Sequence, residues 1–286
     1  MMGREGSLVT VNGQVNPNLL IDKGGLLRLR ILNASPARFY RLSLENHPFY
    51  LIATDQGAIA EPVELQELLL ALGERAEVLV RGERETGQYR LLNLPYNRGG
   101  TMMGDGLGNM NGMGMMGGDR MMNRTQAQSQ VLATLSYKDS VSSLPLPQKL
   151  IPIEVLPEPK TVRRIEMSMA MGSGMRMDFM FNEQVFDPQR VDTEVQLDTV
   201  EDWEIVNIDP DRMDHPFHLH INPFQVISRN GQPEPYRAWK DTVLVRGGET
   251  VRIRIPFRDF VGKTVYHCHI LDHEDLGMMG TLQISS

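Results

Sequence analysis

The sequence has little of three features, and each shortage excludes a class of protein. With one cysteine among 286 residues, no disulfide can form within the chain. No apolar run reaches the roughly 18 residues that a membrane-spanning helix needs, so we expect no membrane span. Basic residues are too few for a phosphate-binding surface, because the chain has 29 Lys and Arg and 36 Asp and Glu, which gives a net charge of −7. This balance argues against a nucleic-acid partner.

Short runs in which apolar and polar residues alternate recur along nearly the whole chain, broken by Gly, Pro and Asn. This period of two is typical of half-buried strands and predicts an all-β fold. Only residues 62–72 have a pattern that a helix of any length can use. The clearest strand candidates are residues 27–32, 76–80, 89–92, 131–135, 203–206, 242–245 and 251–255.

The length suggests two domains, taking roughly 100–200 residues for each. Residues 144–159 contain five prolines, which cannot donate to a β-ladder, so we expect an extended connector there. The predicted domains are residues 1–150 and 151–286. They look like copies of one another, because residues 29–33, 47–52 and 73–78 match residues 203–207, 215–220 and 248–253 in the same order. Only the second copy keeps its histidines.

Six of the seven histidines lie between residues 215 and 273, together with the only cysteine. They form two groups, His-Pro-Phe-His-Leu-His at 215–220 and His-Cys-His-Ile-Leu-Asp-His at 267–273. Residues two apart on a strand share a face. His267 and His269 are therefore expected on one face and Cys268 on the other, with His218 and His220 as a second same-face pair. This arrangement predicts two metal sites back to back.

On the inner side, Cys268 can meet His215 and His273, with Met278 as a weak axial thioether. Two His and one Cys with a distant Met form the blue-copper arrangement, which suits electron transfer. On the outer side, four imidazoles offer nitrogen ligands for further copper. Zinc also takes His and Cys, but a structural zinc site needs four ligands rather than seven or more in two opposed sets. We therefore favour copper over zinc and over histidines that are merely hydrogen-bonded.

The two groups resemble the C-terminal copper signatures of the multicopper oxidases, which include laccases, bilirubin oxidases and bacterial cuprous oxidases. The resemblance covers essentially the whole chain and implies two cupredoxin-like Greek-key β-barrels in tandem. It implies a type 1 copper on His215, Cys268, His273 and Met278, a type 2 copper on His218, and a type 3 pair on His220, His267 and His269. Electrons would pass from the type 1 site through Cys268 to His267 and His269, and O2 would be reduced at the trinuclear cluster.

The chain departs from the family pattern in one respect. A complete enzyme has eight histidines on its trinuclear cluster, and this chain offers four. The others come from His-x-His motifs in a first domain, and no such motif occurs before residue 218. His47 alone cannot replace them, and we expect it to be at the surface or hydrogen-bonded. The resemblance therefore implies a fragment without its N-terminal cupredoxin domain. It also implies a periplasmic or otherwise extracytoplasmic location, although residues 1–7 carry no signal-peptide core.

Methionines are abundant, and their clusters bear on the reducing substrate. Residues 99–122 hold eight Met and nine Gly, a composition that predicts a loop, either an inert insertion or a capture site for Cu(I), which thioethers select. The Met residues at 167–180 fit core packing on a strand better. In bacterial cuprous oxidases an Asp and a Met four and two residues before the first type 1 histidine bind substrate Cu(I), and Asp211 and Met213 occupy these positions.

Three functions remain open from the sequence. The first is an oxidase that couples one-electron oxidation of Cu(I) or a phenol to O2 reduction, of which this chain is a part. The second is an electron-transfer module that uses the type 1 site alone. The third is a Met-rich protein for copper binding or copper tolerance, without oxidase activity.

Overall fold

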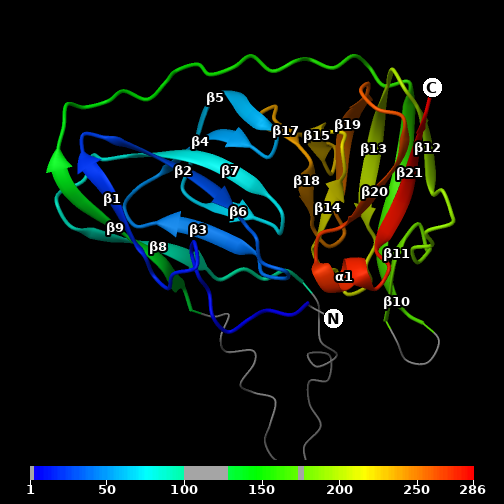
Figure 1. Ribbon diagram of the computed structural model, residues 1–286, viewed down its shortest axis with the longest axis horizontal. Helices are drawn as coiled ribbons and strands as arrows, with labels where there is room; N and C mark the ends of the chain where they lie inside the picture. The colour runs from blue at the N-terminus through cyan, green and yellow to red at the C-terminus, as the bar shows by residue number, and fades with distance from the viewer. Residues whose placement is uncertain (1–2, 100–127, 173–176) are drawn as a thin grey trace, which may run out of the picture.

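The computed structural model describes residues 3–99, 128–172 and 177–286. Strands make up nearly all of its regular structure, which confirms the all-β prediction (Figure 1). The helix in the described residues is α1 (Leu271–Asp275), and no helix there is long and apolar enough to cross a bilayer. The Met-rich segment falls outside the described residues from residue 100 to its end at 122.

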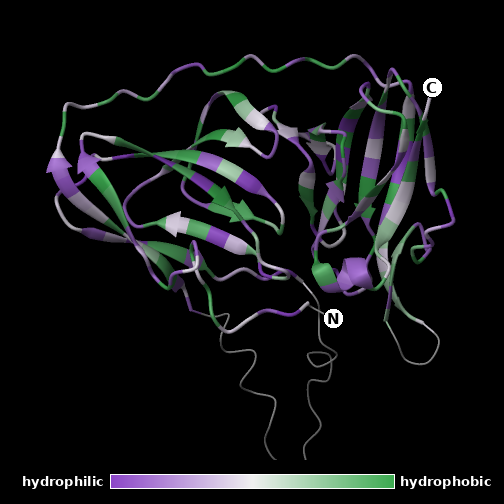
Figure 2. Ribbon diagram, in the orientation of Figure 1, coloured by the Kyte–Doolittle hydropathy of each residue, from purple (hydrophilic) through white to green (hydrophobic). Residues whose placement is uncertain are grey.

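Strands β1 to β9 form two sheets in the N-terminal part of the chain. Hydrophobic residues alternate with hydrophilic ones along many strands, so each sheet turns an apolar face inward (Figure 2). The first sheet has the order β1 (Asn18–Lys23), β9 (Gln130–Ser140), β8 (Gln88–Leu94), β3 (Tyr40–Leu44) and β6 (Leu68–Leu70). The second has the order β2 (Leu26–Leu32), β7 (Arg75–Arg81), β4 (Phe49–Thr54) and β5 (Gly57–Leu65).

Strands β10 to β21 form two further sheets in the C-terminal part. One has the order β11 (Met177–Phe181), β10 (Thr161–Met171), β13 (Thr199–Asn207), β19 (Thr250–Phe257), β15 (Phe224–Arg229) and β16 (Gln232–Pro233), with β17 (Trp239–Lys240) also paired to β15. The other has the order β12 (Thr193–Gln196), β21 (Met279–Ser285), β20 (Gly262–Cys268), β14 (His215–Leu219) and β18 (Thr242–Val245). Residues 141–160, which contain no strand, run along the top of Figure 1 between the two parts.

The helix considered for residues 62–72 is wrong, because this segment forms the end of β5 and all of β6. Pro62 is tolerated because β5 lies at the edge of its sheet, where a missing N–H leaves no ladder bond unmade. In β6, Leu68 and Leu70 are buried and Leu69 is half-buried, the alternation of a strand.

The predicted repeat is visible in the hydrogen bonds of the two parts. The backbone N–H of Asn33 donates to the carbonyl of Glu74 at 3.1 Å, and that of Asn207 donates to the carbonyl of Glu249 at 3.0 Å. In both copies the glycine before the glutamate donates back to the asparagine carbonyl. In both, the asparagine side chain also bonds two backbone carbonyls nearby. The same turn is therefore built twice.

The two apolar cores cross the boundary between the parts. Phe39, Ala71 and Leu72 of the N-terminal part belong to the core of the C-terminal part. In return, Ala238 of the C-terminal part packs into the N-terminal core. The turn between β6 and β7 is thereby fixed against the C-terminal part.

Candidate metal centre

A fully buried set of three side chains lies where β14, β20 and α1 meet. His215 begins β14, Cys268 ends β20, and His273 lies in α1 five residues later. The Sγ of Cys268 is 3.7 Å from Nδ1 of His215 and 3.6 Å from Nδ1 of His273. The two Nδ1 atoms are 3.2 Å apart, and all three residues are 0% exposed. One sulfur and two nitrogens thus converge on one point, as the sequence predicted.

The protonation of His215 is set by a carboxylate. Its Nε2 lies 2.9 Å from Oδ2 of Asp209, so the Nε2–H donates and Nδ1 presents a lone pair to the set. Nδ1 of His273 lies 3.2 Å away, so in the metal-free chain it can donate its proton to this lone pair. A metal ion bound by both nitrogens would take the place of that proton.

Met278 closes the loop that carries these residues. Its side chain is 0% exposed, its N–H donates to the carbonyl of His273 at 2.9 Å, and its carbonyl accepts from the N–H of Cys268 at 3.0 Å. Phe179 stacks on the His273 ring with the centroids 4.3 Å apart. These contacts hold the ligand-bearing loop rigid and exclude water from it.

Burial raises the pKa of the Cys268 thiol well above its usual range. The thiolate, which is the form that binds metals, is thus not stable in this pocket on its own. A bound cation supplies the charge that stabilises it. The site therefore favours a soft, thiolate-binding ion such as copper or zinc.

A second set lies on the other face of the same two strands. The β14–β20 register places Phe217 opposite Cys268 and His218 opposite His267, so the cysteine and its neighbouring histidine point to opposite sides. His218, His220 and His267 bring ligand nitrogens within 4.8 Å of one another. The Nε2 atoms of His220 and His267 are 3.0 Å apart.

The Nδ1 atoms of two of these rings are already engaged. The Nδ1–H of His218 donates to the carbonyl of Asp241 at 2.9 Å, and that of His267 donates to the carbonyl of Cys268 at 2.9 Å. Glu274 also approaches Nδ1 of His267 to 3.2 Å. Since Nδ1 of His218 and of His267 carries the proton, Nε2 of these two rings is left with a lone pair.

His269 lies beside this set but outside its tightest group. It follows the last residue of β20, and its ring centroid is 5.5 Å from that of His267 and 5.3 Å from that of His218. Its nitrogens do not join the three that converge. The expected pairing of His267 with His269 is seen as two neighbouring rings, and the N–H of His269 continues the pairing with β14 by donating to the carbonyl of Pro216 at 2.9 Å.

The imidazoles of His218, His220 and His269 stay neutral to a lower pH than a free histidine does. Burial lowers the pKa of His218 to about 4, with the neighbouring histidines adding to the effect against the opposing charge of Asp241. Burial also lowers the pKa of His220 and of His269. Neutral imidazole is the form that binds a metal, so these three rings remain competent for binding below neutral pH.

The residues expected at a substrate copper differ in exposure. Asp211 is exposed in the loop before β14, and its N–H donates to the side chain of Asp209 at 2.8 Å. Met213 is only 2% exposed and packs in the core. Solvent therefore reaches the carboxylate but not the thioether. Most of the Met-rich segment lies outside the described residues, and so does Met175 of the second methionine cluster.

Three carboxylates that matter here were missed by the sequence analysis. Asp209, Asp241 and Glu274 contact the histidines through hydrogen bonds or close approach. They lie outside strands or in a five-residue helix, so no alternation marks them. Nearness in sequence to the histidine groups was a signal for Asp209 and Glu274, whereas Asp241 lies 21 residues after His220 and had no such signal.

Comparison with known proteins places these residues in a family. A family model described as multicopper oxidase matches residues 158–286, and a second model of that description matches residues 1–105. The multicopper oxidase mco of Staphylococcus haemolyticus is 30% identical over 289 residues, covering 99% of this chain and 54% of the relative. The cell division protein FtsP of Xenorhabdus nematophila is 30% identical over 98% of this chain and 55% of its own.

A solved structure supports the same conclusion. The multicopper oxidase from Campylobacter jejuni, described as a metallo-oxidase, superposes with a TM-score of 0.83 at 34% identity, covering all of this chain and 58% of that one. The curled sheets of the fold match the cupredoxin-like domains of such structures. The chain spans about half the length of the curated relatives it matches. Copper is the metal that this family implies, and the chain belongs to the multicopper oxidase family.

Proposed function

We propose that this chain is the electron-accepting part of a multicopper oxidase and supplies half of its trinuclear centre. The observation that carries the proposal is the buried triangle of His215, Cys268 and His273, whose donor atoms lie 3.2 to 3.7 Å apart. The proposed domains are residues 1–150, without copper ligands, and residues 151–286, which carry all of them. The strand-free segment 141–160 between the two pairs of sheets supports this division.

The triangle fits a type 1 copper, with Met278 as the axial ligand. Its donors are one thiolate and two imidazoles, the set that gives blue copper, and every member is buried. A structural zinc site would need a fourth strong ligand, and a thioether is a weak one for zinc. Asp209 fixes the tautomer of His215 and therefore presents Nδ1 to the metal.

The second set fits part of a trinuclear centre, with His218 for type 2 copper and His220, His267 and His269 for the type 3 pair. In its exposed position this set has room for further ligands, since His220 and His269 are not fully buried. We propose that the remaining ligands come from an N-terminal cupredoxin domain outside this sequence. The coverage of about half of each relative supports this proposal.

Bound copper would supply one-electron redox chemistry at the first set and O2 reduction at the second. The chain contributes a short link between them, because Cys268 is bonded through the backbone to His267 on one side and His269 on the other. Burial of the first set excludes water, and it also excludes small-molecule oxidants. Asp241 and the Cys268 carbonyl hold the imidazoles of the second set with Nε2 facing inward.

We propose Cu(I) or a phenol as the reducing substrate and an extracytoplasmic place of action, both from the family resemblance. The exposed Asp211 supports a cation such as Cu(I), because it offers a free carboxylate two residues from the buried Met213. A second candidate is an electron-transfer module. It is favoured by the completeness of the first set within this chain, whereas the second set is only partial.

Copper per chain, with visible and EPR spectra of the same reconstituted sample, tests the proposal. We expect one tightly bound blue copper, which Cys268→Ser abolishes, and additional weaker copper at the second set. O2 consumption with Cu(I) or a phenol should appear only when the N-terminal domain of a full-length relative is added. A colourless protein with bound metal would overturn the type 1 assignment. Reversible one-electron chemistry without O2 consumption in the reassembled protein would favour the second candidate.

A further inference from the structure

We infer that the N-terminal part, which carries no copper ligand, positions the imidazoles of the second set, and that Arg75 and Gly73 are its positioning residues. The inference rests on the proposed function. Gly73 lies in the turn between β6 and β7, and Arg75 is the first residue of β7; both belong to the Gly-Glu-Arg motif at residues 73–75 that repeats as Gly-Glu-Thr at 248–250. In the second copy threonine replaces the arginine, so the repeat itself does not require Arg75.

Arg75 reaches from the N-terminal part to a residue that contacts His218. Its Nη1 and Nη2 atoms each lie 2.6 Å from an oxygen of the Asp241 carboxylate. The guanidinium is also anchored to its own side by the carbonyl of Asp55 at 2.8 Å. A two-point contact of this kind fixes the orientation of the carboxylate as well as its charge.

The Asp241 carbonyl and carboxylate together hold the tautomer of His218. The carbonyl can only accept, and it accepts from the Nδ1–H of His218 at 2.9 Å. The hydroxyl of Thr242 donates to Oδ1 of Asp241 at 2.9 Å, so its oxygen is free to accept from the same Nδ1–H at 3.0 Å. If the carboxylate turns away, the hydroxyl is free to donate to Nδ1 and competes with the carbonyl. Part of the His218 population then carries its proton on Nε2 and loses the lone pair there.

The backbone of Gly73 comes close to the ring of His269, which lies beside the second set. It has a φ of +77°, and a Cβ added there would lie 2.4 Å from Nε2 and Cδ2 of His269. No side chain fits in that space without moving the ring. The glycine therefore serves two needs, the left-handed turn and the close approach of the backbone to an imidazole.

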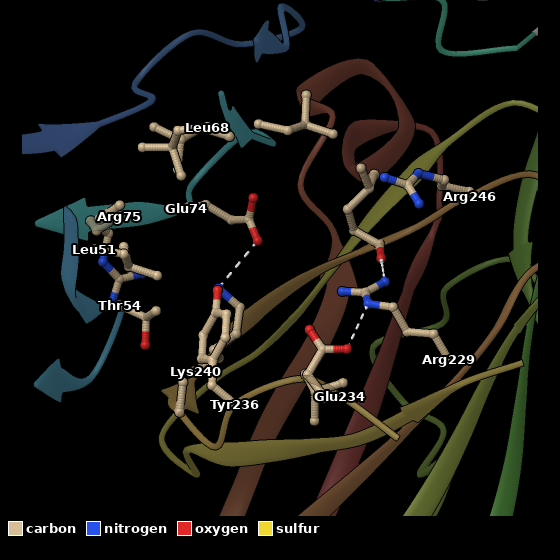
Figure 3. Close-up of a pocket in the computed structure, with 16 residues that line it drawn as sticks. Leu51, Thr54, Leu68, Glu74, Arg75, Arg229, Glu234, Tyr236, Lys240 and Arg246 are labelled. Atoms are coloured by element: carbon tan, nitrogen blue, oxygen red, sulfur yellow. Dashed lines mark hydrogen bonds and ion pairs between the residues drawn. The ribbon is translucent and has the colours of Figure 1, made fainter. Parts of the chain in front are cut away.

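A buried charge cluster holds this turn in place. Lys240, next to Asp241, contacts Oδ2 of Asp55 at 3.0 Å and Oε1 of Glu74 at 3.2 Å. Figure 3 shows Glu74 reaching from the N-terminal part toward Lys240 across a cavity of about 190 Å³. Gln56 adds a bond to the Asp241 carboxylate at 2.5 Å. The N-terminal part thus contacts both sides of residue 241.

The first experiment measures the tautomer of His218 in the metal-free chain by the ring ¹⁵N shifts, assigned with His218→Gln. We expect the wild type to show a single Nδ1–H form and Arg75→Gln to show a mixture. Arg90→Gln is the matched control, because it removes another arginine–carboxylate pair of the N-terminal part, with Glu45, which does not contact the histidines of the second set. An unchanged tautomer in folded Arg75→Gln would overturn the role of Arg75.

The second experiment compares Gly73→Ala with Gly13→Ala. Gly13 has a φ of +78° and no atom within 4 Å of an added Cβ, so the two variants share the backbone strain and differ only in the contact with His269. We expect Gly73→Ala alone to shift the His269 ring resonances and to weaken Cu(II) binding at the second set at least tenfold. Equal behaviour of the two variants would overturn the role of Gly73.

The absorption of the copper on Cys268 serves as an internal reference in the binding measurements. If the wild type binds no copper at the second set, the proposed function fails there, while the tautomer and ring shifts still decide the positioning roles. If copper binds equally well in all variants and the ring signals do not change, the proposed function stands and this inference fails.

Discussion

Nε2 of His215 lies 2.9 Å from Oδ2 of Asp209, and both side chains are completely enclosed. The carboxylate accepts the only proton of a neutral imidazole and so leaves Nδ1 to face Cys268 and His273. An orienting carboxylate typically contributes ten- to a hundredfold to metal affinity. The pair therefore ties the loop before β14 to the proposed type 1 copper.

Asp209→Ala is expected to weaken Cu(II) binding at the first set by at least tenfold, because His215 loses its tautomer preference. Asp209→Asn keeps an acceptor oxygen and should bind copper more nearly as the wild type does. Because Asp209→Asn removes a negative charge, however, the reduction potential of the copper at the first set should rise in this variant. Chelator competition and a redox titration followed at the blue absorption band measure both effects. Equal affinity in the Ala variant would show that Asp209 does not orient the ligand.

Met278→Leu is expected to keep the blue colour and to raise the reduction potential of the first set, because the axial ligand tunes it. The two side chains have similar volumes, so the fully buried position should lose less than about 1.5 kcal/mol of stability. Spectroelectrochemistry of the purified chain provides the comparison. A potential identical to that of the wild type would remove Met278 from the ligand set.

The strands and the histidine sets were predictable because both depend on local pattern. Alternation marked strands such as β2 and β19, and the alternation of faces placed the adjacent residues His267 and Cys268 on opposite sides of β20. His269 follows the last residue of β20, yet its N–H still donates to the carbonyl of Pro216 in β14 and its ring lies beside that of His267.

What the sequence could not indicate depends on contacts between distant segments. Arg75 and Asp241 are 166 residues apart, and no sequence motif indicates that the two side chains pair. The helix considered for residues 62–72 was wrong because the period of its leucines was ambiguous, and pairing of β6 with β3 decided the outcome. Tertiary pairing thus overrode the local preference.

Lys240→Met is expected to lower the free energy of unfolding by about 3–5 kcal/mol. Burial opposes the charge of Lys240, but the carboxylates of Glu74 and Asp55 outweigh it and raise its pKa, so the lysine is charged. Its loss leaves Glu74 without its cation and Asp55 with only Arg75, at 4.0 Å. Lys23→Met is the control, since its partner Glu85 is exposed and such pairs contribute about 0–1 kcal/mol. Similar losses in urea titrations of both variants would contradict the prediction.

His47, outside the metal sites, should make stability depend on pH. It is 4% exposed and hydrogen-bonded to Tyr137 and the Glu45 carbonyl. Of the two roles expected for His47, the hydrogen-bonded one is therefore confirmed and the surface position is not. Burial lowers its pKa below the ordinary 6.5. Below pH 6.5 the unfolded chain therefore binds more protons than the folded one, and stability falls as the pH drops.

His47→Gln should flatten that dependence by up to about 0.7 kcal/mol per pH unit at pH 6.5, where half of the unfolded chains are protonated, and by up to about 1.4 kcal/mol per pH unit at lower pH. Tyr137→Phe breaks the same hydrogen bond but keeps the titrating ring, so it should lower stability without flattening the curve. Urea unfolding at pH 5.0 to 7.5 distinguishes these outcomes. The prediction does not survive if both variants keep the wild-type slope.

Ile221, immediately after His220, has a φ of +68° and is 56% exposed. A β-branched residue is an outlier in this conformation, which costs about 1–2 kcal/mol in the backbone. Ile221→Gly should consequently be more stable than Ile221→Ala by about 1 kcal/mol in urea titrations. At Ile208, which is also exposed but has no positive φ, the order should be reversed, because glycine there only adds entropy to the unfolded chain. The same order at both positions would mean that residue 221 is not strained.

The strained residue 221 lies next to a proposed copper ligand. Ile221→Gly should therefore also loosen the His220 ring and weaken copper binding at the second set.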